Sequence, residues 1–334
     1  MTRRLAKFIW VLNSTCSMAA RKKTKREKIT TQRFFENQAE PLQMNLVAGK
    51  SGLGRTIIEP TVNRPSLALA GFTKYIAYKR IQVIGNAEAY YLKSLFMSER
   101  TKRYKKLCSY KIPCIVYTRN LPIDKQLKSI ANEAGVPVFQ TPMVTMRFVN
   151  LATIELDLLF APRDTVIGSM VDVHGIGVLI RGESGIGKSE TVLELIEKGY
   201  SLVSDDATKV TLLDGREIIG TSSELSRDHM EVRGIGIINV GAMFGAKSVR
   251  TEKRLDLVVT LKSWKESDDV DRLGIDEDFM IILGVKVRHI SIPVRPGRTL
   301  ARLIEVAALS TKLSAAGYNP AREFNDRLIA KMSN

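Results

Sequence analysis

One stretch, GESGIGKS at residues 182–189, constrains this chain more than any other. It satisfies the pattern G-x-x-x-x-G-K-[ST], with the apolar run GVLI shortly before it and the amphipathic run ETVLELIEKG after it. A strand, a glycine turn and a helix in this order bind phosphate, because the backbone N–H groups and the positive helix N-terminus face the phosphate oxygens. We therefore expect Lys188 to neutralise phosphate charge and the Ser189 hydroxyl to ligate Mg²⁺.

A second glycine-rich stretch, GKSGLG at residues 49–54, is a weaker candidate. Its lysine precedes the glycines, so no lysine follows the last glycine to reach a phosphate, and the β-branched run TIIE comes next. This stretch is predicted to be a turn between short elements.

Two acidic residues follow an apolar strand in YSLVSDDATKV at residues 200–210. Asp205 and Asp206 are thereby expected at the carboxyl edge of a sheet, where α/β proteins bind their ligands. One carboxylate could hold a metal or its water shell, and the other could accept a proton from an attacking hydroxyl. The alternative is a solvated pair that caps a turn.

The pattern of short apolar runs divides the chain. RIQVIG (80–85), CIVYT (114–118) and PVFQT (137–141) are typical of strands, and KQLKSIANEAG (125–135) is typical of a helix. We expect an α/β protein with a basic, disordered extension over residues 1–40, a small N-terminal α/β domain over 41–155, and a second α/β domain over 156–334 that carries the loop.

The net charge of +16 is unevenly placed. Residues 1–150 carry +19, much of it in RKKTKREK (21–28) and RTKRYKK (100–106), and residues 151–334 carry −3. Such runs are either solvated surface or an electrostatic footprint for a polyanion such as nucleic acid, and the first interpretation is favoured.

Composition also excludes two classes of protein. No apolar run approaches the roughly 18 residues of a membrane span, and FIWVL near the N-terminus is shorter than the core of a signal peptide. Three cysteines, an odd number without metal-ligand spacing, fit reduced thiols in the cytoplasm.

Four segments together carry a family resemblance: GVLIRGESGIGKSETVLELIEKGYSLVSDD, MEVRGIGIINV (230–240), DRLGID (271–276) and PVRPGR (293–298). In order and spacing they resemble HPr kinase/phosphorylase, and NRPSLALAGF (63–72) resembles that family's N-terminal domain. The resemblance implies a C-terminal P-loop kinase domain similar to phosphoenolpyruvate carboxykinase-type kinases. It covers roughly residues 42–330.

The resemblance also implies roles for individual residues. ATP would bind at Gly182, Glu183, Ser184, Gly185, Ile186, Gly187, Lys188 and Ser189. Mg²⁺ would be held by Ser189 and Glu231. Asp206 matches the proton acceptor with Asp205 beside it, and Arg272 matches a catalytic arginine that stabilises the transferring phosphoryl group.

Further implications concern the reaction and its partners. The kinase would phosphorylate a serine of the phosphocarrier HPr from ATP or pyrophosphate, and would regulate carbohydrate metabolism as a cytoplasmic homohexamer. The segment Pro293, Val294, Arg295, Pro296, Gly297 and Arg298 would serve the reverse reaction, in which inorganic phosphate removes the phosphate from HPr.

One position departs from the family. IGSMVDVHG (167–175) has Ile167 where the family has a catalytic histidine, and isoleucine can neither accept a proton nor bind phosphate oxygens. His174 lies an odd number of positions away, on the other face of a strand, so it does not replace that histidine. His174, His229 and His289 are interpreted as packed or solvent-facing residues.

Two alternative functions remain open at this stage. A P-loop kinase that acts on a small molecule would carry the same loop and acidic pair. A regulatory NTPase associated with nucleic acid would account for the basic first half, although such binding is the less favoured interpretation of those charges.

Overall fold

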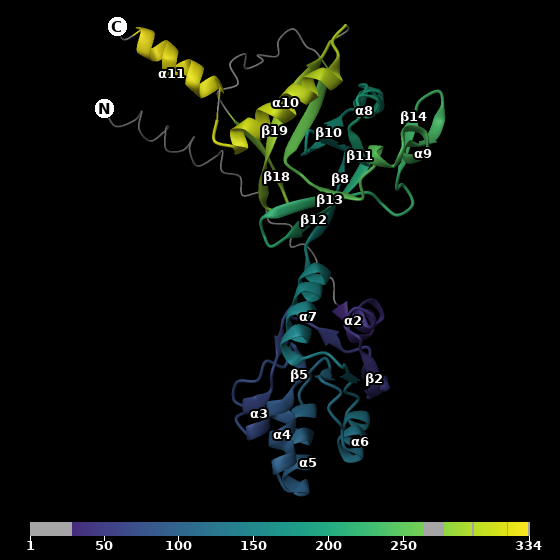
Figure 1. Ribbon diagram of the computed structural model, residues 1–334, viewed down its shortest axis with the longest axis vertical. Coiled ribbons are helices and arrows are strands. Elements are labelled where there is room, and N and C mark those ends of the chain that lie inside the picture. The colour runs from purple at the N-terminus through teal and green to yellow at the C-terminus, as the bar shows by residue number, and fades with distance from the viewer. Residues whose placement is uncertain (1–28, 264–276, 296, 319, 333–334) are drawn as a thin grey trace, which may run out of the picture. The chain divides into compact units, whose positions relative to one another are not determined.

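The computed structural model describes residues 29–263, 277–295, 297–318 and 320–332. The chain forms two compact units, Met1–Phe160 and Ala161–Asn334 (Figure 1). Each unit has its own sheet and hydrophobic core.

The N-terminal unit is built on a five-stranded sheet. Its strand order is β2 (Asn45–Ala48), β7 (Val138–Gln140), β6 (Ile115–Tyr117), β5 (Ile81–Ile84), β4 (Val62–Asn63). Strands β4 to β7 are parallel and β2 is antiparallel to β7. Every residue of β5 and β6 is buried, as expected for parallel strands that are covered on both faces.

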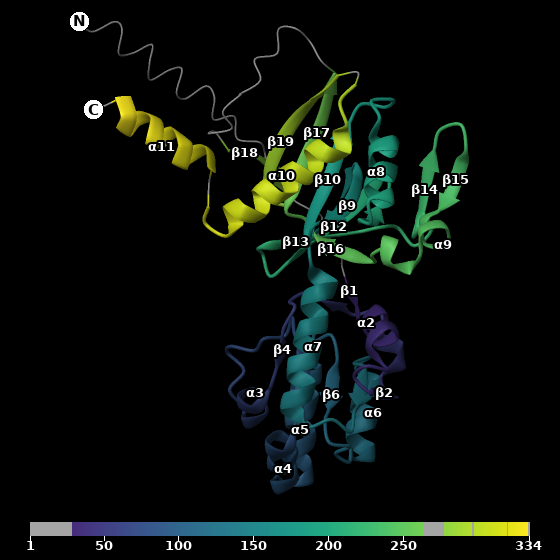
Figure 2. The same cartoon turned by 45° about the horizontal axis from the view of Figure 1, so that its top comes forward.

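Helices cover both faces of this sheet. One face packs against α2 (Thr31–Gln38) and α7 (Thr145–Phe160), whose Phe34 and Phe148 are fully buried, and Figure 2 shows α7 crossing this face. The other face packs against α3 (Ser66–Ala70), α4 (Asn86–Ser94), α5 (Met97–Cys108) and α6 (Lys125–Glu133). The predicted strands near 80–85, 114–118 and 137–141 and the helix near 125–135 are confirmed.

The structure differs from the expected extension over residues 1–40. Residues 29–38 form β1 (Ile29–Thr30) and then α2. Strand β1 pairs with β3 (Thr56–Ile57). The Thr30 side chain caps α2 by accepting from the Arg33 N–H, and Phe34 is buried in the core. Apolar residues in this short segment therefore join the fold because they pack against strands that follow later in the chain. Residues 1–28 lie outside the described residues.

The glycine-rich stretch at 49–54 is a structural turn, as predicted. It contains a short 3-10 helix, η1 (Lys50–Gly52), and Gly49 has a φ of 72° with no room for a Cβ, which would lie 1.9 Å from the Val136 carbonyl oxygen. The Arg55 guanidinium donates hydrogen bonds of 2.6 and 2.8 Å to the carbonyls of Gly135 and Ala134. The turn thus binds the protein's own backbone.

The C-terminal unit is built on a six-stranded sheet. Its strand order is β11 (Ser201–Ser204), β9 (Ser169–Val173), β10 (Ile176–Gly182), β17 (Leu257–Ser263), β19 (Val285–Val294), β18 (Asp278–Ile282). The three central strands β10, β17 and β19 are parallel, so their carboxyl ends lie at one edge. The other three strands are antiparallel to their neighbours.

Two different layers cover this sheet. Helices α8 (Lys188–Glu197) and α10 (Leu300–Ala315) pack on one face, and Figure 2 shows α10 lying across the parallel strands. A four-stranded antiparallel sheet packs on the other face, in the order β16 (Glu252–Arg254), β13 (Glu217–Thr221), β12 (Ala207–Leu213), β8 (Arg163–Ile167). The remaining elements are the hairpin β14 (His229–Val232) and β15 (Gly236–Asn239), α9 (Val240–Phe244), η2 (Ala246–Ser248) and α11 (Pro320–Met332).

The continuous apolar run of β10 follows from these two layers. Residues on β10 alternate between the helical side, which includes Val178 and Ile180, and the side of the second sheet, which includes Leu179. The strand therefore needs apolar residues at successive positions. At the carboxyl edge of the sheet, β10 leads into the glycine-rich loop at residues 182–189.

Candidate active site

The loop at 182–189 joins the end of β10 to the start of α8. Gly185 and Gly187 have φ angles of 84° and 100°, in the region that side chains disfavour. Gly187 is the N-cap of α8 and offers no capping side chain. These two glycines let the chain turn tightly into the helix, so the loop's geometry depends on them.

The first turn of α8 has free hydrogen-bond donors. The N–H groups of Gly187, Lys188, Ser189 and Glu190 donate to no atom of the described residues, and the first bonded N–H is that of Thr191, 3.0 Å from the Gly187 oxygen. Unsatisfied N–H groups at a helix start attract an anion, and the helix dipole adds to the attraction. The loop therefore fits a phosphate group.

Lys188 folds back over this loop. Its Nζ atom donates hydrogen bonds of 3.0 and 2.9 Å to the carbonyl oxygens of Gly182 and Glu183. It lines a cavity of about 210 Å³ whose other lining residues are Ser184, Gly185, Gly187, Ser189, Glu190, Asp206, Glu231 and Arg233. The structure thus brings together Lys188, Ser189, Asp206 and Glu231, which the sequence analysis selected from three separate segments.

The two neighbouring aspartates have different surroundings. Asp205 is 8% exposed; its Oδ1 accepts a 2.8 Å hydrogen bond from the Ser169 hydroxyl, and its Oδ2 accepts a 3.0 Å bond from the Glu231 N–H. Burial raises the pKa of Asp205, although these hydrogen bonds oppose the shift. Asp205 therefore stabilises the position of the hairpin residue Glu231 through its backbone N–H.

Asp206 is exposed and lines the 210 Å³ cavity. Its φ of 54° places its backbone in the left-handed region, which aspartate tolerates better than most residues. This turn of the backbone occurs between β11 and β12, so the second carboxylate leaves the core while the first remains in it. Because of the left-handed φ of Asp206, the two neighbouring carboxylates lie in different surroundings: Asp205 is buried and Asp206 lines the cavity.

Hairpin β14–β15 supplies two side chains to the same cavity. Glu231 and Arg233 alternate with the buried Val232, so both lie on the outer face of the strand and its turn. The Arg233 Nη2 atom donates a 2.8 Å hydrogen bond to the Ser184 hydroxyl of the loop. Arg233 was not predicted from the sequence, although its position two residues after Glu231 could have indicated it.

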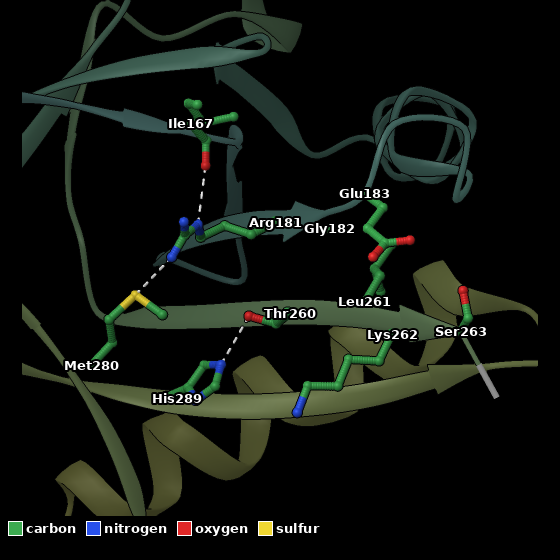
Figure 3. Close-up of a pocket in the computed structure, with 10 residues that line it drawn as sticks. All are labelled: Ile167, Arg181, Gly182, Glu183, Thr260, Leu261, Lys262, Ser263, Met280 and His289. Carbon is green, nitrogen blue, oxygen red and sulfur yellow. Dashed lines mark hydrogen bonds between the residues drawn. The ribbon is translucent and has the colours of Figure 1, made fainter. Parts of the chain in front are cut away.

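A larger cavity of about 800 Å³ borders the loop through Gly182 and Glu183 (Figure 3). Ile167 lines it and is 72% exposed. The Arg181 Nε atom donates a 3.1 Å hydrogen bond to the Ile167 carbonyl oxygen. His289 lies in this cavity, bonded to Asp278 and Thr260, and was not recognised from the sequence because these three residues come from different strands.

Other candidate residues lie elsewhere. Arg272 and Pro296 lie outside the described residues. Pro293 and Val294 end β19, where the register pairs them with Lys262 and Ser263 of the larger cavity. After them the chain turns at Gly297, with φ 80°, and the Arg298 N–H donates to the Arg295 carbonyl oxygen at 3.3 Å.

The remaining histidines are removed from the loop or exposed. His174 is in the turn that starts β10, at the opposite end of that strand, and its Nε2 lies 2.7 Å from the Tyr200 hydroxyl. His229 Nδ1 lies 2.7 Å from the Arg227 carbonyl oxygen. Both have hydrogen-bond partners that account for them without a ligand.

A strand, a glycine loop with free N–H donors and a helix in this order define the C-terminal unit as a P-loop domain. The family model for the HPr serine kinase N terminus matches residues 29–156, and the model for the HPr serine kinase C-terminal domain matches residues 159–328. The chain belongs to the HPr serine kinase family, which confirms the resemblance stated from the motifs.

Two relatives that match most of the chain agree with this assignment. The chain is 41% identical over 300 residues to HPr kinase/phosphorylase 1 of Oceanobacillus iheyensis, covering 90% of this chain and 96% of that protein. It is 40% identical to the HPr kinase/phosphorylase of Geobacter sulfurreducens, covering 91% and 95%. The solved Hpr(Ser) kinase/phosphatase of Coxiella burnetii is 33% identical, with a TM-score of 0.44, and covers 48% of this chain and 98% of that one.

Cys108 and Cys114 are buried, unpaired thiols. Burial raises the pKa of Cys108 to about 12, so this thiol is unreactive.

Within the described parts of the chain, no helix combines the length and the apolar character that crossing a membrane requires.

Proposed function

We propose that this protein transfers a phosphoryl group from ATP, with Mg²⁺, to a serine of the phosphocarrier HPr, and that it also runs the reverse, phosphate-driven reaction. One observation carries the proposal: Lys188, Ser189, Asp206 and Glu231 line one cavity at a loop with free N–H donors. The names of the relatives support HPr as the acceptor. The small-molecule kinase and the nucleic-acid-associated NTPase have no comparable support.

The residues present fit a nucleotide and a magnesium ion. The N–H groups of the first helical turn and Lys188 would hold the phosphates, and Ser189 and Glu231 would hold the ion. The described residues contain no group of three or more His, Cys, Asp or Glu side chains that could hold a metal by themselves, so phosphates and waters would complete the shell. When bound, Mg²⁺ would neutralise the charge that develops on the phosphates.

The chain's own groups would perform the remaining steps. Asp206 would accept the proton of the serine hydroxyl as the serine oxygen forms its bond to the γ-phosphorus and ADP leaves. Asp205 would hold Glu231 in place through its N–H, and Arg233 would hold the loop through Ser184. Arg272 would stabilise the transferring group, as the family resemblance implies.

In the reverse direction, an oxygen of inorganic phosphate would attack the phosphorus of phosphoserine, the bond from this phosphorus to the serine oxygen would break, and pyrophosphate would form, with Asp206 returning the proton to the serine oxygen. The segment at residues 293–298 would serve this direction. Because Ile167 offers neither a proton nor a hydrogen bond from its side chain, we expect this direction to be the slower one.

The test is a transfer assay with purified protein, labelled ATP, Mg²⁺ and HPr. We expect label on one HPr serine, located by mass spectrometry, and none when HPr carries alanine at that serine. Label on a small molecule of a cell extract with none on HPr would contradict the proposal. A parallel reaction with labelled pyrophosphate tests the second donor.

The assembly and the compartment are part of the proposal. A hexamer and a cytoplasmic location both follow from the family resemblance, and the buried unpaired thiols are compatible with a reducing compartment. Light scattering should give about six times the chain mass of 37.3 kDa. A monomeric mass at micromolar concentration would contradict the hexamer.

A further inference from the structure

The cavity of about 800 Å³ is lined by several polar side chains to which the proposed function gives no role. It borders the phosphate loop at Gly182 and Glu183, and its other polar lining residues come from the strands that end at the same edge of the sheet (Figure 3). Its volume is in the range of small-molecule sites. The question is which ligand the polar groups on its wall would recognise.

Strand register places three of these groups on one face. Arg181 of β10 is the register partner of Thr260 on β17, and Val258, two residues before Thr260, is the partner of His289 on β19. Residues two apart on a strand share a face, so Arg181, Thr260 and His289 all face the second sheet. Figure 3 shows Thr260 and His289 facing each other across this cavity wall.

A hydrogen-bond chain connects three of the side chains. Asp278 Oδ2 lies 2.6 Å from His289 Nδ1, and His289 Nε2 lies 2.8 Å from Thr260 Oγ1. The hydrogen bond from His289 lowers the pKa of Asp278, so this carboxylate is ionised and accepts from the Nδ1–H. In a neutral imidazole with its proton on Nδ1, the lone pair on Nε2 accepts a hydrogen bond from the Thr260 hydroxyl.

Protonation of His289 would reverse the second bond. Imidazolium carries a proton on both nitrogens, so Nε2–H would donate to Thr260 Oγ1. The Thr260 hydroxyl proton would then be free to point into the cavity. When His289 gains a proton, the Thr260 hydroxyl can therefore donate a hydrogen bond to a ligand in the cavity. With neutral His289 it can only accept one from the ligand.

The surrounding charges favour an anion. Arg181 donates from Nε to the Ile167 oxygen and from Nη1 to the Met280 sulfur at 3.0 Å, while its Nη2 has no partner among the described residues. Lys262 also lines the cavity. Glu183 is the single acidic residue among the described lining residues, and the Asp278 carboxylate is bonded to His289.

We propose that this cavity is an oxyanion site in which Thr260 donates a hydrogen bond, and that His289, oriented by Asp278, is the positioning residue that releases this donor when it is protonated. Arg181 Nη2 and Lys262 supply the positive charge. The ligand is a tetrahedral oxyanion such as inorganic phosphate. The inference deepens the proposed function, on which it rests for the relevance of phosphate, because the cavity borders the phosphate loop and contains Ile167.

Binding of sulfate and inorganic phosphate to the full chain tests the site directly, without HPr or ATP. The measurement uses Lys188→Ala protein, in which the loop site is weakened, and isothermal titration calorimetry. Sulfate is the main probe because its charge does not change between about pH 6 and about pH 8, so a change of affinity over this range comes from the protein. We expect sulfate to bind roughly tenfold more tightly at the lower pH, the effect of one hydrogen bond to a charged group.

Three variants in that background separate the roles. Thr260→Val should weaken sulfate binding at low pH by about tenfold, and Thr260→Ser should restore it. His289→Gln should abolish the pH dependence. His174→Gln, at the far end of β10, is the matched control and should retain it. Circular dichroism and thermal melting establish that each variant is folded.

Two results would overturn the inference: sulfate affinity that Thr260→Val leaves unchanged, or pH dependence that survives His289→Gln. Because these measurements need no phosphoryl transfer, their failure leaves the proposed kinase activity intact. Conversely, oxyanion binding with the expected pH dependence in a protein that never phosphorylates HPr would contradict only the proposed function.

Discussion

The Asp205 carboxylate accepts a hydrogen bond of 3.0 Å from the backbone N–H of Glu231, which lies 26 residues further along the chain. This bond joins the end of β11 to hairpin β14–β15, on which Glu231 lines the cavity at the phosphate loop. The buried aspartate therefore acts on the proposed metal site through the backbone of a residue that can ligate the metal.

The exposed aspartate is tested by Asp206→Asn. Asparagine keeps the size of the side chain but cannot accept a proton, so phosphorylation of HPr should fall by about 10²- to 10⁴-fold. Nucleotide affinity, measured by equilibrium binding, should change little because the loop donors are intact. An Asp206→Asn protein with unchanged turnover would show that another group accepts the proton.

The buried aspartate is tested by Asp205→Asn. An amide N–H would face either the Ser169 hydroxyl or the Glu231 N–H, and only the hydroxyl can turn to accept it. Because burial disfavours the charged carboxylate and the amide can keep both bonds, the free energy of unfolding should change by less than about 1 kcal/mol, whereas the weaker bond to the Glu231 N–H should raise the Mg²⁺ requirement for nucleotide binding. Urea unfolding and Mg²⁺ titrations measure the two effects. If turnover falls while the Mg²⁺ requirement stays constant, the roles of the two aspartates are exchanged.

Lys188→Ala tests the phosphate loop. Without the ammonium group, transfer should fall by about 10²- to 10³-fold because charge on the phosphoryl group is no longer neutralised. Steady-state assays with HPr measure the loss. The control is Lys247→Ala, which removes an exposed lysine of η2 and should leave the rate unchanged. Full activity in a folded Lys188→Ala protein would refute the assignment of the nucleotide site.

Glu88 makes the stability of the N-terminal unit depend on pH. Its burial alone would raise its pKa, but hydrogen bonds from Arg64, Ser66 and the Gly85 N–H outweigh burial, so the pKa of Glu88 lies below the ordinary value of 4.5. A lowered pKa stabilises the folded state above the unfolded value, and this contribution is lost as the pH falls through the folded value.

The corresponding variant is Glu88→Gln. At neutral pH it should lower the free energy of unfolding by roughly 2 kcal/mol, and the difference from the unmodified protein should shrink as the pH falls below about 4.5. Urea unfolding followed by circular dichroism measures it. Glu99→Gln, which removes exposed ion pairs to Lys102 and Arg103, is the control and should cost less than about 1 kcal/mol. A difference that grows in acid would contradict this assignment.

Ile167→His tests the position where the chain departs from its family. The side chain is exposed in the cavity beside the loop, so a histidine can be accommodated. We expect phosphate-driven dephosphorylation to increase more than phosphorylation, with the gain falling above about pH 6.5 as the histidine loses its charge. Rates in both directions measure it, and Ile167→Gln is the polar control that does not titrate. Equal gains in both directions would contradict the interpretation.

Much of the site could be predicted because its parts are local in sequence. The loop, Lys188 and Ser189 are adjacent, and an apolar strand and an amphipathic helix flank them within a few residues. Asp205 and Asp206 follow the next strand, where the carboxyl edge of a sheet is expected. The same holds for strands β5, β6 and β7, whose apolar runs are short and bounded by turns.

Other features depend on the tertiary structure. Residues 29–38 have few apolar side chains and resembled an extension, yet Phe34 is buried because the sheet formed by later residues provides a surface for it. Asp205 and Asp206 could not be distinguished by type. Only the left-handed backbone of Asp206 decides which carboxylate faces the cavity.

By itself the sequence determined the phosphate loop, the order of its flanking elements and the family, because these depend on residue type over short spacings. The tertiary structure alone decided that Thr260, Asp278 and His289 form one hydrogen-bond chain. They lie on three strands whose neighbours are set by sheet order and register. Strand pairing results from the packing of the whole sheet against its helices and its second layer, and spacing along the chain does not specify it.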